Sequence, residues 1–268
     1  MASTRPPRVP LLTLLMRRYP EEEKKTLYAW ILCGEIRVNG TGVKDPKQVV
    51  SEDSFLEHRG GGYVSRGGDK IASVFPYLLE RYPPLDPSGA YVLDAGASTG
   101  GFSDFLLQAG ASRVYCLDVG YNQLDYRLRT DPRVTVLERC NVLDVEELIR
   151  QGRIDPAPWF CTADLSFRSI QGAASALLAS STKGLLLALI KPQFERRYAS
   201  KHRGRTGGGW SDDFEGIVSE DEIPDILEDV RSRLSREGVQ ILEVLPSGVP
   251  GAKGNQEYFF LMTMKSGN

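Results

Sequence analysis

The chain has 268 residues, of which 41% are hydrophobic and 25% charged, so it can bury a large core and form one or two globular domains. Its net charge of −2 is unevenly divided, because residues 1–70 carry 12 Lys and Arg against 9 Asp and Glu, whereas the remainder carries 21 against 26. This balance excludes a general basic coat for nucleic acid, so any RNA contact must be local.

The N-terminal part of the chain predicts a small α+β unit. Leucines on one face predict a helix over 9–18, and a second helix over 22–33 is closed by Gly34. The dipeptide Asn39-Gly40 ends a short strand over 35–40 and is a hairpin signal. Further short strands are expected at Val43 and within 49–56.

Residues 29–43, Ala-Trp-Ile-Leu-Cys-Gly-Glu-Ile-Arg-Val-Asn-Gly-Thr-Gly-Val, resemble the S-four RNA-binding domain first seen in a small-subunit ribosomal protein. We assign this domain to residues 1–58. The resemblance implies that its helices and hairpin present basic side chains to the RNA backbone. The candidates are Lys24, Lys25, Arg37 and Lys44. The alternative is a module that serves only for protein docking.

Residues 59–68 combine glycine with arginine, which predicts a flexible basic linker or a plain hinge. The stretch 63–70, Tyr-Val-Ser-Arg-Gly-Gly-Asp-Lys, resembles the signature of the TlyA-type proteins, which join an S-four domain to an FtsJ-like methyltransferase domain. The resemblance implies that Arg66 contacts RNA and that residues 69–268 form the methyltransferase domain.

From residue 69 the pattern alternates strand and helix, which indicates a parallel sheet covered on both faces. Strands are expected over 91–93, 113–117, 134–137, 159–163, 184–190, 238–245 and 257–264. Helices are expected over 70–81, 102–108, 145–151, 170–180 and 220–236. Because 246–256 contains no helical pattern, the last strand should run antiparallel. The methyltransferase resemblance implies the same α/β class, a Rossmann-like seven-stranded sheet with its last strand reversed.

The stretch 92–102 places a carboxylate, Asp94, between an apolar strand and a glycine-rich loop that leads into a helix. Open α/β sheets bind nucleotide-like ligands at such a turn. The spacing is neither that of a dinucleotide loop nor that of a P-loop, and an acidic residue suits an amine or a ribose. The pattern D-x-G-x-x-x-G-G-F resembles motif I of FtsJ-like methyltransferases, which implies S-adenosylmethionine as cofactor. The alternative is a tight turn that binds no ligand.

Cofactor contacts are expected in this loop and at the ends of the following strands. Asp118 ends the second strand, where a carboxylate can accept both ribose hydroxyls, and Asn141 follows the third, where it can read the adenine edge or serve only the turn. The cofactor-binding candidates are Asp94, Gly96, Ser98, Gly100, Gly101, Phe102, Asp118, Asn141 and Asp164.

Lys191 directly follows an apolar strand, where burying an unpaired lysine is costly. Asp164 ends a neighbouring strand, so we expect the two to pair. With Lys70 and Glu257 they match the Lys-Asp-Lys-Glu tetrad of FtsJ-like ribose 2′-O-methyltransferases. The resemblance implies that Lys191 acts on the 2′-hydroxyl and that Asp164 orients it, while Lys70 and Glu257 hold the hydroxyl and its phosphate. Whether Lys191 is a base or a cationic stabiliser stays open.

The polar stretch 196–216 predicts either an RNA-facing loop or a disordered surface loop. Its basic, glycine and aromatic residues are Lys201, His202, Arg203, Arg205, Gly207–Gly209 and Trp210. Because His58 and His202 are the only histidines and the four cysteines lack C-x-x-C spacing, we expect no metal site and no His-based triad. No apolar run reaches the ~20 residues of a membrane span, and no signal peptide is expected. These features favour a soluble cytoplasmic protein.

The resemblance extends from about residue 9 to residue 264. It implies a methyltransferase that moves a methyl group from S-adenosylmethionine to the ribose 2′-hydroxyl of ribosomal RNA, on cytidine, with ribosomal subunits as partners. One alternative is a catalytically silent protein that assists ribosome assembly. Another is a haemolysin, the family's other name, although a direct cytolysin should show an insertion helix. A small-molecule methyltransferase would leave the N-terminal domain without a role.

Overall fold

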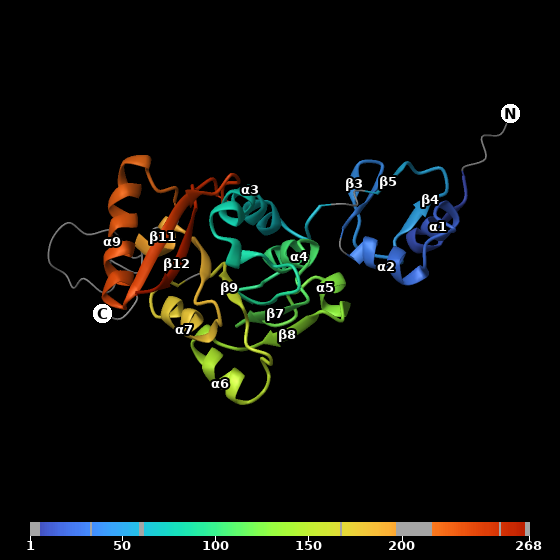
Figure 1. Ribbon diagram of the computed structural model, residues 1–268. Helices are drawn as coiled ribbons and strands as arrows, with labels where there is room; N and C mark the ends of the chain where they lie inside the picture. The colour runs from blue at the N-terminus through green and yellow to red at the C-terminus, as the bar shows by residue number, and fades with distance from the viewer. Residues whose placement is uncertain are drawn as a thin grey trace.

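The computed structural model describes residues 6–32, 34–58, 62–166, 168–196, 216–251 and 253–265. Its centre is a seven-stranded sheet in the order β11-β12-β10-β9-β6-β7-β8 (Figure 1). The strands are β6 (Tyr91–Ala95), β7 (Arg113–Asp118), β8 (Val134–Glu138), β9 (Phe160–Ala163), β10 (Leu186–Ile190), β11 (Val239–Pro246) and β12 (Tyr258–Met264). β12 is antiparallel to both neighbours and the other pairs are parallel, which confirms the predicted architecture.

Helices cover both faces of this sheet because neighbouring strand residues point to opposite sides. On one face lie α3 (Arg66–Arg81), α4 (Gly101–Gln108) and α5 (Tyr126–Thr130), which share a core with alternate strand residues such as Val92 and Phe259. On the other lie α6 (Val145–Arg150), α7 (Ala173–Ser180) and α9 (Ile223–Arg236), which pack with Leu93, Phe260 and their neighbours. Residues 192–196 form one further helical turn after β10.

The predicted linker over 59–68 is wrong at its C-terminal end, because α3 begins at Arg66. Gly67 and Gly68 belong to its first turn, where they allow close packing. A Cβ on Gly68 would overlap the Tyr63 ring, and a Cβ on Gly101 of α4 would lie 2.8 Å from the Gly68 nitrogen. These glycines therefore bring α3 against the start of α4. Residues 59–61 lie outside the described part of the chain.

Other helix starts also differ from the prediction, by one to three residues in α1, α2, α4, α7 and α9. α7 begins at Ala173 instead of residue 170, because Gly172 takes a φ of +74° and donates its N–H to the carboxylate of Glu237 at the end of α9. α5 was not predicted, since five residues give no helical periodicity. Its start is capped by Asp125, whose carboxylate accepts the Arg127 N–H at 3.0 Å.

The N-terminal residues form a separate unit with its own core, which includes Leu11, Leu27 and Ile31. Its elements are β1 (Arg8–Pro10), α1 (Leu11–Arg18), α2 (Lys24–Leu32), β2 (Ile36–Val38), β3 (Thr41–Gly42), β4 (Val49–Ser51) and β5 (Leu56–His58). The first helix starts two residues later than predicted, because residues 8–10 pair with β4. Strand β3 ends before Val43, which packs into the core instead.

A small contact joins this unit to the larger one. Arg127 on α5 forms an ion pair with Glu35 at 2.5 Å, and Glu35 also lies 3.2 Å from His58. Beside them the rings of Tyr28 and Tyr126 meet edge to face, with centroids 6.4 Å apart. The N-terminal unit is therefore seated against α5, with its helix α2 beside it (Figure 1). Across the described ranges, every helix is too short or too polar to cross a membrane.

Candidate active site

Asp94 lies near the end of β6 and is fully buried, because the strand extends two residues beyond the predicted end. The Ser103 hydroxyl donates to Asp94 Oδ2 at 2.6 Å, and the Thr162 hydroxyl donates to Oδ1 at 3.0 Å. Burial raises the pKa of Asp94 to about 6, and the two hydroxyl hydrogen bonds only partly oppose this. The two hydroxyl groups thus hold the Asp94 carboxylate in one orientation beneath the glycine-rich loop.

The loop between β6 and α4 depends on backbone conformations that glycine adopts readily. Gly96 has a φ of +79°, and a Cβ there would lie 2.6 Å from the Asp164 carbonyl oxygen. Ser98 has a φ of +48°, and its N–H donates to Asp118 Oδ2 at 2.8 Å. The other Asp118 oxygen accepts the Gly120 N–H at 2.7 Å. Asp118 therefore shapes two loops at once, beyond its predicted place beside a ligand.

Two cavities open at this edge of the sheet and share Gly96, Ser98 and Asp164. The smaller, of about 180 Å³, is polar, and its lining includes Ser65, Arg66, Lys70, Asp94, Thr99 and Phe102. The larger, of about 400 Å³, is lined by residues that include Leu117, Asp118, Val119, Asn141 and Leu165. An elongated ligand with a polar, charged end and a nucleoside end fits this pair of cavities.

The remaining predicted cofactor residues differ in their surroundings. Gly101 and Phe102 line the smaller cavity, and the Phe102 ring stacks on Phe259 with centroids 5.8 Å apart. Asn141 lines the larger cavity, and its side-chain oxygen accepts the Leu143 N–H at 3.0 Å, so it also serves the turn. Gly100 lines neither cavity. Its φ is +96°, and it allows close packing of the loop against Leu124 and Leu128.

The four residues of the predicted tetrad form two ion pairs. Lys191 Nζ lies 2.6 Å from Asp164 Oδ1 and donates to Ser166 Oγ at 3.0 Å. Lys70 Nζ donates to Glu257 Oε2 at 2.6 Å. Lys70, Lys191 and Glu257 are 8%, 9% and 3% exposed, so each charge needs its partner.

Strand directions explain how residues so far apart in the chain meet. Asp164 follows β9 and Lys191 follows the adjacent parallel strand β10. Glu257 precedes the reversed strand β12, whose Tyr258 is in register with Ile190 of β10, so its carboxylate lies at the same edge. Lys70 comes from the second turn of α3. Lys70 and Asp164 line the smaller cavity directly.

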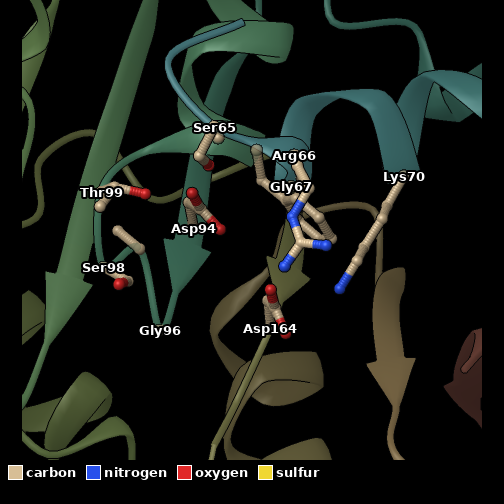
Figure 2. A pocket seen from close by; sticks show the side chains of 12 residues that line it. Ser65, Arg66, Gly67, Lys70, Asp94, Gly96, Ser98, Thr99 and Asp164 are labelled. Carbon is tan, nitrogen blue, oxygen red and sulfur yellow. The ribbon is translucent and has the colours of Figure 1, made fainter. Parts of the chain in front are cut away.

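Arg66 lies in the candidate active site and not among the predicted RNA contacts. It was expected on the RNA, yet it lines the smaller cavity, and Figure 2 shows its guanidinium pointing toward Asp164 beside Lys70. Sequence reasoning also missed the hydroxyl groups that support the carboxylates, those of Ser103, Thr162 and Ser166. A lone hydroxyl residue gives no signal in the sequence, because its partner is set only by the fold.

The other predicted RNA contacts lie on the N-terminal unit. Lys24, Lys25 and Lys44 are exposed, and Lys25 forms an ion pair with Glu23 at 2.7 Å. Arg37 is half-buried and donates to the Gly40 carbonyl at 3.2 Å, within the hairpin. The basic and glycine-rich stretch 201–210 lies outside the described residues. The described ranges hold no group of three or more residues able to bind a metal ion.

Residues 63–263 match the FtsJ-like methyltransferase family. The chain is 34% identical to the 16S/23S rRNA (cytidine-2′-O)-methyltransferase TlyA of Mycobacterium tuberculosis, over 91% of this chain and 86% of that protein. It is also 34% identical to Hemolysin A of Brachyspira hyodysenteriae, over 85% of this chain and 88% of that protein. A solved structure of a Streptococcus thermophilus protein assigned as a hemolysin has a TM-score of 0.61 and 29% identity, and covers 97% of this chain and 90% of its own. The chain therefore belongs to the FtsJ-like methyltransferase family, in its TlyA group, and is an S-adenosylmethionine-dependent methyltransferase.

Proposed function

We propose that this protein methylates the ribose 2′-hydroxyl of a cytidine in ribosomal RNA. The observation that carries the proposal is the Lys191–Asp164 pair, because Asp164 lines both cavities and holds the Lys191 side chain next to them. The choice of substrate follows from the TlyA relatives, because the proteins from Mycobacterium tuberculosis and Campylobacter jejuni are rRNA (cytidine-2′-O)-methyltransferases. Such a substrate is found with ribosomes, in the cytoplasm.

The two cavities have the donors and acceptors that the cofactor requires. Asp118 has carboxylate lone pairs for ribose hydroxyls beyond the two backbone N–H groups that it already accepts. Asp94 and Arg66 offer opposite charges to the amino and carboxylate ends of the methionine part. When bound, S-adenosylmethionine supplies an electrophilic methyl group on a sulfonium sulfur.

The ion pairs then define what the protein does to the RNA. The Asp164 carboxylate orients the Lys191 side chain, which stabilises negative charge as it develops on the 2′-oxygen. Lys70 lines the smaller cavity from α3 and, together with its partner Glu257, fixes the hydroxyl and its neighbouring phosphate. Positioning of this kind can supply several kcal/mol of a reaction barrier. The proton of the hydroxyl leaves to solvent.

The N-terminal unit would deliver the RNA. We propose that it is an S-four-like RNA-binding domain, supported by its own core and its exposed Lys24, Lys25 and Lys44. Its ion pair to Arg127 seats it beside the loops that line the cavities. The exposed lysines of this unit would bind RNA phosphates and so bring a neighbouring part of the RNA to the active site.

The test is methylation of purified ribosomal subunits with radiolabelled S-adenosylmethionine, followed by mapping of 2′-O-methyl groups on the RNA. We expect label at one or a few cytidines. Lys191→Ala should lower the rate ~100-fold or more at a temperature at which the variant is still folded. Lys183→Ala is the matched control, because Lys183 precedes the same strand and lies over the Trp159 ring, at the opposite edge of the sheet. Full activity in Lys191→Ala, or label only on bases, would refute the proposal.

A further inference from the structure

The two segments that carry Lys191 and Asp164 are connected by more than their own contact. Asp164 is followed by irregular chain and Lys191 by a single helical turn, so the ion pair between them does not by itself fix the course of either segment. Four or five residues further on, both segments reach the same buried cluster beside α9. This cluster consists of Glu195, Ser169 and Arg233 and is called the α9 clamp below.

Glu195 joins the two segments directly. Its side chain is 3% exposed, Oε1 accepts the Ile170 N–H at 2.9 Å, and Oε2 accepts the Ser169 hydroxyl at 2.7 Å. Its own N–H donates to the Lys191 carbonyl at 3.1 Å, in the helical turn over 192–196. One carboxylate therefore ties the segment after β10 to the segment after β9.

Arg233 anchors this tie to α9. It is 7% exposed, and its guanidinium donates to Glu195 Oε2 at 2.9 Å and to Ser169 Oγ at 2.7 Å. Its Nε donates to Asp229 Oδ2 at 2.9 Å, one turn earlier on the helix. A buried arginine shared by two segments costs desolvation, and replacing such charges by apolar groups is often neutral for stability. Stability alone therefore does not account for it.

Neither Glu195 nor Arg233 lines the two cavities that share Asp164. The residues that they tie lie five positions after Asp164 and four positions after Lys191. The effect of the clamp on the site must therefore pass through the backbone of both segments.

We propose that Arg233 and Glu195 are positioning residues, which hold the Lys191 ammonium and the Asp164 carboxylate in the geometry that methyl transfer needs. The inference rests on the proposed function. A misplacement of about 1 Å at a reacting group can cost ~100-fold in rate. Without the guanidinium, the Glu195 carboxylate is buried without its cation, so its bonds to Ser169 and Ile170 hold the two segments less firmly and the Lys191 side chain is less well placed beside the 2′-oxygen.

The test compares Arg233→Met with two controls on the same helix. Arg236→Met removes an exposed arginine whose guanidinium bonds only Ser232 among the contacts seen. Val230→Ala creates a cavity in the fully buried core of α9 and supplies a general loss of stability. For each protein we would measure kcat on ribosomal subunits, the Kd of S-adenosylmethionine by calorimetry, the unfolding temperature, and amide exchange in peptides covering 164–172.

For Arg233→Met we expect kcat to fall at least tenfold, while the Kd of S-adenosylmethionine changes less than twofold. The Ile170 amide should exchange faster in this variant and not in Arg236→Met. Val230→Ala should lower the unfolding temperature while it retains kcat. Glu195→Gln, which keeps the shape and loses the charge, serves if Arg233→Met does not fold, and should show the same separation of kcat from Kd.

The inference fails if Arg233→Met retains the wild-type kcat. It also fails if Val230→Ala, at a similar unfolding temperature, loses as much kcat as Arg233→Met. Faster Ile170 exchange without loss of kcat would also overturn it. An inactive wild-type protein would refute the proposed function instead, so the two failures are distinguishable.

Discussion

Asp94→Asn tests whether the buried carboxylate carries the energetic penalty that its surroundings predict. The pKa of Asp94 is about 6 in the folded chain against an ordinary value of 3.8. The folded state therefore holds its proton more tightly than the unfolded state, so stability falls as pH rises from about 4 to about 6. The total penalty above that window is about 3 kcal/mol, at about 1.4 kcal/mol for each pKa unit. An asparagine has no charge to bury and avoids this penalty.

The measurement is urea unfolding of wild type and variant, without cofactor, at pH ~4.5 and pH ~7.5. The packing changes that the substitution causes do not depend on pH, whereas the ionisation of Asp94 does, so the difference between the two pH values isolates the titration of this carboxyl group. The free energy of unfolding of the variant relative to wild type should rise by about 2 kcal/mol from the lower to the higher pH. If the difference in unfolding free energy between variant and wild type changes by less than about 0.5 kcal/mol between the two pH values, Asp94 ionises normally and the reasoning is refuted.

Three further predictions concern the loop and the second ion pair. Gly101→Ala places a Cβ 2.8 Å from the backbone of α3 and should cost about 1–3 kcal/mol in urea unfolding, whereas Gly42→Ala, which has open space, should change stability by less than about 0.5 kcal/mol. Asp118→Ala removes the acceptor of two loop N–H groups and should weaken S-adenosylmethionine binding at least ~10-fold by calorimetry; unchanged affinity would contradict its role. Lys70→Met leaves Glu257 buried without its cation and should cost about 3 kcal/mol, and replacing both residues by Met should restore stability but not methyl transfer.

Most of the sheet was predictable because its signals are local. Apolar runs separated by helical patterns indicate a parallel sheet, and the missing helix in 246–256 indicates the reversed β12. The element ends were less predictable. β6 continues through Asp94 because Ser103 and Thr162 satisfy a carboxylate inside the sheet. Only tertiary contacts decide this.

Some residues of the candidate site could also be predicted from local sequence signals, whereas others could not. The cost of burying Lys191 after an apolar strand predicts a nearby carboxylate, and Asp164 follows from strand adjacency. Lys70 and Glu257 could be selected only from the family pattern, because 187 positions separate them and neither follows a distinctive run. Arg233 gave no signal at all. An arginine on a polar helix is normally exposed, and its burial depends on two segments from other parts of the chain.

The contact between Lys70 and Glu257 has a consequence for how the enzyme matures. Lys70 is synthesised early, as part of α3, whereas Glu257 is synthesised late, directly before β12. A nascent chain that contains α3 but not yet β12 therefore has Lys70 without its partner Glu257. The group of four charged residues is therefore complete only after β12 has paired with β10.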